Sequence, residues 1–179
     1  MKVLFGAGEI AEAIERLARE IARDYAGQPL VLLGVLKGAL ITTVDLARAL
    51  GAVPDGPSQI FVDFVSVGSY GGSTESSGEV RLLMDSAVSL EGRGVVIVED
   101  IVDTGLTLEY LQALFQGRGA GAVRTCVLFD KPARRRVAVP LDYAGLRVPD
   151  GFVVGYGLDY QDMYRNLPYL AVLETYQES

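Results

Sequence analysis

The sequence has 179 residues, of which 50% are hydrophobic and 22% are charged, so it can bury the core of one globular domain. Its 16 basic and 23 acidic residues give a net charge of −7, which disfavours a general nucleic-acid binder, because such proteins need Lys and Arg to meet phosphates. Histidine is absent, which excludes both histidine catalysis and a histidine-ligated metal.

The predicted elements begin with an amphipathic helix over about residues 9–25, where apolar residues from Ile10 to Tyr25 recur at helical spacing. Short apolar runs then alternate with helical patterns. We predict strands at 29–36, 60–67, 80–84, 94–98, 123–130, 152–157 and 170–173, and helices at 39–50 and 106–116. Such alternation indicates an α/β fold, with a central, mainly parallel sheet covered by helices on both faces.

The segment 68–78, GSYGGSTESSG, is predicted to be a flexible loop because nine of its eleven residues are Gly, Ser or Thr. It contains Ser69 and Tyr70. An aromatic side chain among such small residues indicates a lid that closes over something, although a plain hairpin tip is the alternative.

The N-terminal run KVLFGAGEIA matches the Gly-x-Gly-x-x-Ala pattern of a dinucleotide-binding turn. Such a fold also needs an acidic residue at the end of its second strand to hold ribose, and here Leu36-Lys37-Gly38 stands there. We therefore interpret the run as a short strand and a turn before the first helix.

The most informative stretch is VVIVEDIVDTGLT, Val95 to Thr107, in which a buried strand leads into Glu99, Asp100 and Asp103. Ligands of parallel sheets bind beyond the carboxyl ends of strands. The N–H groups of Thr104 to Thr107 open a helix and would bind phosphate there. The carboxylates would accept hydrogen bonds from sugar hydroxyls or hold a hydrated Mg²⁺. An ordinary turn with acidic helix caps is the alternative.

The single cysteine, Cys126, lies in an apolar run and cannot form an internal disulfide, which fits a reduced, cytoplasmic setting. No run approaches the ~18 apolar residues of a membrane span. We also expect no signal peptide, because the N-terminus lacks a basic segment followed by an apolar one.

The stretch from Val95 to Thr107 resembles the phosphoribosyl-pyrophosphate (PRPP) binding motif of type I phosphoribosyltransferases. Other segments narrow the resemblance to the hypoxanthine-guanine phosphoribosyltransferases. GVLKGAL is similar to that family's pyrophosphate loop, VDFVSVGSYGG to its lid, and LFDKPARRR and PDGFVVGYGLDYQDMYRNLPY to its purine-binding hood. The resemblance implies one domain over residues 1–179, whose small hood comes from the N-terminal segment and about residues 131–165. It also implies purine salvage, in which PRPP and hypoxanthine or guanine give IMP or GMP and pyrophosphate.

The resemblance assigns PRPP binding to one set of residues: Glu99, Asp100, Asp103, Thr104, Gly105, Leu106, Thr107, Lys37, Gly38 and Arg165. Glu99 and Asp100 would lie near one Mg²⁺, and Asp159 would bind a second. The resemblance also implies a non-proline cis peptide at the Lys37–Gly38 loop. Some relatives carry a polar or basic residue in place of Leu106, so one side-chain contact is lost here while the backbone cradle remains. A surface lysine at 37, a helix cap at Asp159 and a solvated Arg165 are the alternatives.

The resemblance assigns purine binding to Lys131, Phe152, Val153 and Asp159. It assigns to Asp103 the role of general base or acid at purine N7. Lys131 would donate to the 6-oxo group, and an ammonium has only donors, so it favours 6-oxo over 6-amino purines. Phe152 would stack on the base, while Val153 would present backbone groups to its edge. Arg135 matches a hood arginine that supports the site, although residues 134–136 could equally be a solvated face.

Two other functions stay open. A regulator could keep the PRPP fold and bind nucleic acid, which would need a basic face on this acidic chain. A transferase could prefer xanthine, since xanthine shares the 6-oxo group that Lys131 would contact. The resemblance further implies a homodimer or homotetramer.

Overall fold

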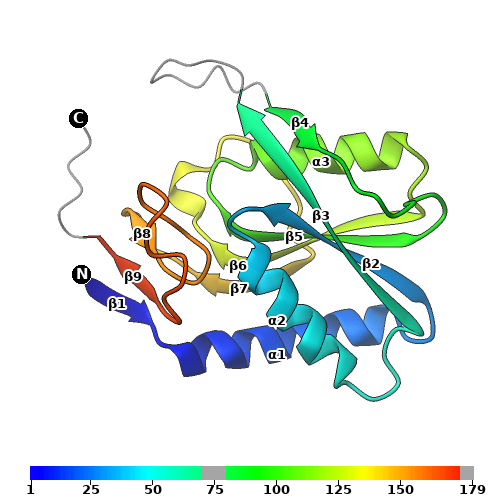
Figure 1. Ribbon diagram of the computed structural model, residues 1–179, viewed down its shortest axis with the longest axis horizontal. Helices are drawn as coiled ribbons and strands as arrows, with labels where there is room; N and C mark the ends of the chain where they lie inside the picture. Colours follow the sequence, from blue (N-terminus) through cyan, green and yellow to red (C-terminus); the bar gives the residue numbers. More distant parts are fainter. Residues whose placement is uncertain (70–79, 174–179) are drawn as a thin grey trace.

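The computed structural model describes residues 1–69 and 80–173, which form two β-sheets and three α-helices (Figure 1). The larger sheet has the order β4-β3-β2-β5-β6-β7, and only β3 and β4 pair antiparallel. Its strands are β2 (Pro29–Leu36), β3 (Gln59–Ser69), β4 (Val80–Met84), β5 (Gly94–Val102), β6 (Ala122–Asp130) and β7 (Tyr143–Arg147). The helices are α1 (Ala7–Asp24), α2 (Leu40–Gly51) and α3 (Leu106–Gly117), with a 3-10 turn η1 (Pro132–Arg134). The predicted α/β fold is confirmed.

The two faces of the larger sheet are covered by different helices, α1 and α2 on one face and α3 on the other (Figure 1). Alternate residues of the central strands point to opposite faces, as strand geometry requires. Leu32 and Val96 belong to the cluster that contains α1 and α2, whereas Val31 and Ile97 belong to the cluster that contains α3. Within the described residues, no helix has the length and apolar character needed to cross a membrane.

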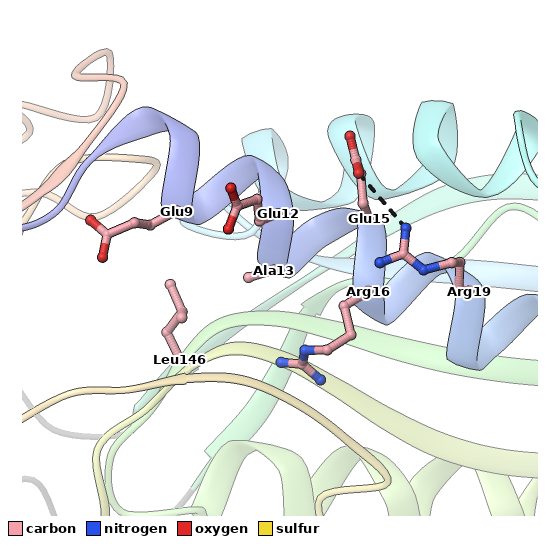
Figure 2. A pocket seen from close by; sticks show the side chains of 7 residues that line it. All are labelled: Glu9, Glu12, Ala13, Glu15, Arg16, Arg19 and Leu146. Carbon is pink, nitrogen blue, oxygen red and sulfur yellow. Dashed lines mark ion pairs between the residues drawn. The ribbon is translucent and has the colours of Figure 1, made fainter.

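The outer face of α1 is charged, as expected of an amphipathic helix (Figure 2). Glu15 and Arg19 form an ion pair one turn apart, and Nη2 of Arg16 donates to the carbonyl oxygen of Ala144 beside β7. An open hollow of about 480 Å³ lies here, lined by Glu9, Glu12, Ala13, Glu15, Arg16, Arg19 and Leu146. It carries both signs of charge and lies outside the region described below as the site.

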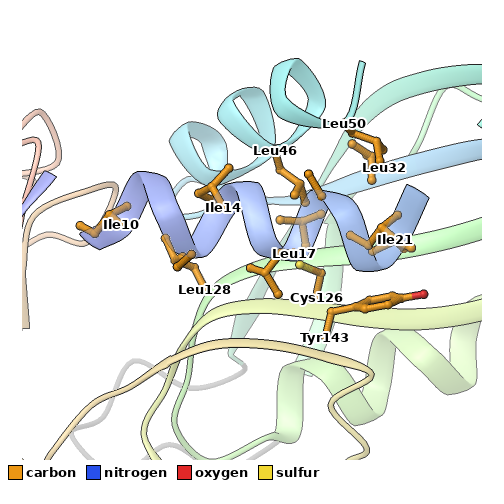
Figure 3. Packing of buried hydrophobic residues seen from close by; sticks show 14 of the residues in the cluster. Ile10, Ile14, Leu17, Ile21, Leu32, Leu46, Leu50, Cys126, Leu128 and Tyr143 are labelled. Carbon is orange, nitrogen blue, oxygen red and sulfur yellow. The ribbon is translucent and has the colours of Figure 1, made fainter. Parts of the chain in front are cut away.

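The inner face of α1 packs on the sheet through Ile10, Ile14, Leu17 and Ile21 (Figure 3). These side chains are at most 3% exposed, and Cys126 of β6 lies among them. The predicted helical spacing therefore identified the buried face correctly. Burial raises the pKa of the Cys126 thiol to about 12, so that this cysteine is an unreactive core residue.

The smaller sheet is antiparallel and has the order β1-β9-β8, with β1 (Lys2–Phe5), β8 (Val153–Val154) and β9 (Leu170–Val172). This sheet lies beside the C-terminal ends of β2 and β5 (Figure 1). The last strand of the chain, β9, thus pairs with the first strand, β1. Because β1 belongs to this sheet, the glycines after it do not follow a parallel strand, as a dinucleotide-binding turn would require.

Two predicted strands had the wrong boundaries, and one strand was not predicted. The strand predicted at 94–98 continues to Val102 as β5. Glu99 and Asp100 therefore lie within the last residues of the strand and not after it. The strand predicted at 152–157 is only Val153–Val154, because residues 155–157 all have positive φ. Strand β7 was missed, since its sequence YAGLR has a weak β pattern and it lies at the edge of the sheet.

Candidate active site

A cavity of about 320 Å³ lies where the carboxyl ends of β2, β5 and β6 meet the smaller sheet. It is lined by Lys37, Gly38, Asp100, Ile101, Asp103, Lys131, Arg134, Gly151, Phe152, Val153, Leu158, Asp159 and Arg165. Four separate segments of the chain contribute these residues. The structure therefore brings together the residues assigned to purine, the pyrophosphate residues Lys37, Gly38 and Arg165, and the metal residues Asp100 and Asp159. Glu99, the third metal residue, does not line this cavity.

A second, smaller hollow of about 120 Å³ lies on the other side of Asp103, at the start of α3. It is lined by Glu99, Ile101, Val102, Asp103, Thr104, Gly105, Thr107 and Leu108. Gly105 has φ of +89°, which glycine adopts readily, and this turn leads the chain directly into the helix. The N-terminus of a helix attracts anions, so this hollow has the chemistry of a phosphate site.

Leu106 is the first residue of α3 and is not among the residues that line the smaller hollow. Its backbone N–H lies 3.4 Å from Oγ1 of Thr104. The leucine side chain therefore adds nothing to the hollow, as expected from its apolar character.

The carboxylates of β5 are held in an environment that disfavours their charge. Burial raises the pKa of Glu99 well above its usual value, and the neighbouring Asp100 adds to the shift. Burial also raises the pKa of Asp100 to about 6, while the backbone N–H of Ile101, at 2.9 Å from its Oδ1, opposes that shift. Among the described residues, Oε2 of Glu99 and Oδ1 of Asp103 are buried without a hydrogen-bond partner. Unpaired buried carboxylate oxygens of this kind call for a cation or a hydroxyl donor.

The loop after β2 contacts the hood directly. The peptide between Leu36 and Lys37 is cis, in the loop where the resemblance implied a non-proline cis peptide. A Cβ added to Gly157 would lie 2.1 Å from the carbonyl oxygen of Gly38, so the two backbones touch. Nζ of Lys37 lies 3.2 Å from Oδ1 of Asp162 at the rim of the cavity.

Asp159 and Arg165 form an ion pair in the hood, with Nη2 of Arg165 at 2.5 Å from Oδ1 of Asp159. Nη1 of Arg165 also donates to the carbonyl oxygen of Gly157, at 2.7 Å. Both side chains line the larger cavity. Asp159 is therefore not a helix cap, and Arg165 is not a freely solvated charge.

Lys131 is a buried ammonium that also lines the cavity and is only 6% exposed. Its Nζ donates to the carbonyl oxygen of Gly151 at 2.9 Å, and lies 3.5 Å from Oδ1 of Asp150 and 3.9 Å from Oδ2 of Asp103. A buried ammonium with donors to spare favours ligand atoms that accept hydrogen bonds.

The aromatic wall of the cavity is Phe152, whose ring makes an edge contact with Tyr160 at 5.5 Å between centroids. Val153 follows it as the first residue of β8 and is buried. The ring is thus held by its neighbour while one side lines the cavity, which suits stacking against a flat ligand.

Arg135 lies behind the cavity and braces the loop that carries Asp103. Its Nε donates to the carbonyl oxygen of Asp103 at 3.0 Å, and its Nη2 donates to Oδ1 of Asp130 at 2.5 Å. The preceding residue, Arg134, lines the cavity and was not assigned from the sequence. Nothing in the run RRR distinguishes the two, because only the 3-10 turn η1 decides which arginine faces the site.

The expected lid falls mostly outside the described residues. Ser69 ends β3, where its backbone pairs with Val80 of β4, and Tyr70 lies outside the described part of the chain.

Comparison with known proteins places this arrangement in a family. A sequence profile described as phosphoribosyl transferase domain matches residues 4–161. The hypoxanthine-guanine phosphoribosyltransferase of Bacillus subtilis is 44% identical over 173 residues, which are 97% of this chain and 93% of that protein. The bifunctional protein TilS/HprT of Listeria innocua is 46% identical over 179 residues, but the chain spans only 27% of its length.

Solved structures agree with the sequence relatives. A hypoxanthine phosphoribosyltransferase from Staphylococcus aureus is similar with a TM-score of 0.89 and 40% identity, covering 97% of this chain and 91% of that one. A Trypanosoma cruzi hypoxanthine phosphoribosyltransferase, in a ternary complex with substrates, has a TM-score of 0.89 and 44% identity, covering 98% of this chain and 96% of that one.

Proposed function

The chain belongs to the hypoxanthine-guanine phosphoribosyltransferases, enzymes of purine salvage, and we propose that its cavity transfers the 5-phosphoribosyl group of PRPP to hypoxanthine or guanine. The products are IMP or GMP and pyrophosphate. One observation carries the proposal: Asp103 lines both the small hollow at the start of α3 and the larger cavity that contains Lys131. A carboxylate therefore stands between a phosphate site and a site for a hydrogen-bond acceptor.

PRPP lies across the end of β5 in this proposal. Its 5-phosphate occupies the smaller hollow, where Thr104 to Thr107 supply backbone and hydroxyl donors. Glu99 and Asp100 accept hydrogen bonds from the ribose hydroxyls. Lys37, Gly38 and Arg165 contact the pyrophosphate from the larger cavity, which all three line.

Magnesium fits the donors of this site. Oε2 of Glu99 and Oδ1 of Asp103 are buried oxygens without a hydrogen-bond partner among the described residues. No group of three or more Asp, Glu or Cys side chains in residues 1–69 and 80–173 is placed to hold a metal by itself. Mg²⁺ commonly keeps waters and binds one or two carboxylates plus substrate phosphates, so Glu99 and Asp100 would hold one ion and Asp159 a second. When bound, magnesium supplies positive charge to the departing pyrophosphate.

The purine lies between Phe152 and the end of β5, with its 6-oxo group toward the buried Nζ of Lys131. Phe152 stacks on the base, and the backbone of Val153 and Asp159 meets its edge. Lys131 has donors only, which is the physical reason for a 6-oxo purine over adenine. Arg135 holds the carbonyl of Asp103, which keeps that carboxylate in place.

The transfer forms a bond from a purine nitrogen to C1 of the ribose as the bond from C1 to the pyrophosphate oxygen breaks. The proton at purine N7 passes to the carboxylate of Asp103. Asp103 lies two residues before Gly105, the N-cap of α3, and its carboxylate is the proton acceptor in this proposal. Ser69 and Tyr70 belong to the lid that excludes water in this proposal.

In this proposal the chain is one domain, and its hood consists of the smaller sheet and about residues 131–165. The enzyme acts in the cytoplasm, where a single thiol such as Cys126 stays reduced. It also includes a homodimer or homotetramer. Val62 of β3 and Leu83 of β4 support an assembly, because they are large apolar side chains that are 41% and 57% exposed. Light scattering of the wild type and of Leu83→Asp tests it, and a monomer in both would exclude it.

A spectrophotometric assay with PRPP and Mg²⁺ tests the activity against hypoxanthine, guanine, xanthine and adenine. We expect turnover of the first two, little of adenine, and loss of turnover when a chelator removes the metal. A preference for xanthine would correct the substrate. Binding of PRPP without turnover of any base would leave a regulator as the better explanation, and binding to RNA or DNA at low salt would then be measured.

A further inference from the structure

The carboxylate of Asp162 lies between the two cations that face the rim of the cavity. Its Oδ1 is 3.2 Å from Nζ of Lys37 and 3.6 Å from Nη2 of Arg165. Lys37 comes from the loop after β2, whereas Arg165 comes from the hood. One carboxylate oxygen thus spans the two parts of the site, and it does so where the proposed function places pyrophosphate.

A tight turn holds Asp162 in this position. Tyr160 and Met163 exchange backbone hydrogen bonds of 3.2 Å and 3.1 Å, and the two residues between them have φ of 54° and 60°. Asp tolerates this left-handed conformation better than most residues. The backbone N–H of Asp162 also donates to Oδ2 of Asp159 at 2.8 Å. The position of the carboxylate is therefore built into the backbone of the hood.

The two carboxylates on Arg165 differ in how firmly they are bound. Asp159 is 2.5 Å from the guanidinium and both side chains are less than a third exposed, at 28% and 29%. The side chains of Lys37 and Asp162 are 70% and 75% exposed, so water screens their attraction. Asp159 is the closer and more buried partner of Arg165, whereas Asp162 is a distant, exposed partner that a more highly charged anion can displace.

We propose that Asp162 is a resident counter-ion, which occupies Lys37 and Arg165 when pyrophosphate is absent and which pyrophosphate displaces. This inference rests on the proposed function, because it assigns the two cations to the pyrophosphate of PRPP. Asp162 acts through those cations and is a positioning residue. Its negative charge competes with pyrophosphate for these cations, so it weakens the binding of PRPP and favours the release of product pyrophosphate.

Isothermal titration of the whole protein with Mg²⁺-pyrophosphate tests the proposal. The variant Asp162→Asn removes the charge and keeps a residue that adopts positive φ readily, so the turn is retained. We expect Asp162→Asn to bind pyrophosphate about three- to tenfold more tightly than the wild type, with the difference shrinking at about 0.5 M NaCl. Asp85→Asn is the matched control, since Asp85 pairs with Arg118 on the surface outside the cavity.

Steady-state kinetics separates this role from simple support of the fold. Asp162→Asn should lower the KM for PRPP by a similar factor and leave the KM for hypoxanthine unchanged, whereas a loosened hood would raise both. If the wild type binds pyrophosphate and turns over while Asp162→Asn binds it equally or more weakly, this inference fails and the proposed function stands. If the wild type neither binds pyrophosphate nor turns over, both fail.

Discussion

Gly38 packs directly against the carboxylate of Asp100, because a Cβ added to Gly38 would lie 1.8 Å from Oδ2 of Asp100. Asp100 is only 8% exposed, and its Oδ1 accepts a hydrogen bond from the N–H of Ile101. The loop after β2 can therefore approach the end of β5 only because residue 38 has no side chain.

Gly38→Ala should lower kcat/KM for PRPP by about 100-fold, because the loop must move by about an ångström to admit the methyl group. The measurement is the steady-state assay with saturating hypoxanthine, together with a thermal melt to confirm folding. Gly8→Ala is the matched control, since nothing lies within 4 Å of a Cβ at that helical position. Full activity in Gly38→Ala would show that the contact has no role in PRPP binding.

Asp100→Asn should stabilise the protein in the absence of substrate at neutral and alkaline pH. Burial raises the pKa of Asp100 from 3.8 to about 6, so the folded state holds the proton more tightly than the unfolded state does. The resulting contribution to stability is complete below pH ~4 and is lost as pH rises to about 6. Asparagine carries no charge to desolvate, so the gain at pH 8 should reach up to about 3 kcal/mol.

Urea unfolding of the wild type and Asp100→Asn at pH 4 and pH 8 measures this difference. The exposed Asp55→Asn serves as the control for the loss of one carboxylate. The same Asp100→Asn variant should bind Mg²⁺-PRPP less tightly, because the charge that costs stability is the one that meets the cation. A variant that is less stable than the wild type at pH 8 contradicts the assigned environment of Asp100.

Lys131→Met should lower kcat/KM for hypoxanthine by about 10- to 100-fold, which is the range for losing a hydrogen bond from a charged donor. The ratio of hypoxanthine to adenine turnover should fall with it, while the KM for PRPP stays close to the wild-type value. The exposed Lys2→Met controls for the loss of a positive charge. An unchanged ratio would mean that another group reads the 6-oxo position.

Arg135→Lys should destabilise the loop that carries Asp103, because lysine cannot contact both the carbonyl of Asp103 and the carboxylate of Asp130. We expect a loss of about 1–3 kcal/mol in the free energy of unfolding and a lower kcat. The neighbouring exposed Arg136→Lys should change neither. Denaturant unfolding and the standard assay check both variants. Equal stability and equal kcat in the two variants would show that Arg135 does not support the loop of Asp103.

Sequence reasoning succeeded where the determining contacts are local. The spacing from Ile10 to Ile21 identified the buried face of α1, and the stretch from Glu99 to Thr107 carries its carboxylates and its helix start within nine residues. It failed where the outcome depends on distant contacts. The choice between Arg134 and Arg135 depends on the turn η1, and the place of Asp162 depends on its meeting Lys37, 125 residues away in the chain.

The most direct measurement is the pre-steady-state and steady-state rate of Asp103→Asn with PRPP and hypoxanthine, beside its affinity for Mg²⁺-PRPP. Asparagine keeps the shape of the side chain but cannot take the N7 proton, so kcat should fall by about 10²- to 10⁴-fold while PRPP affinity changes little. Asp150→Asn is the control, because Asp150 also lies within 4 Å of Lys131 Nζ but is mostly exposed. A wild-type rate in Asp103→Asn would contradict the claim that this carboxylate, between the two hollows, accepts the proton.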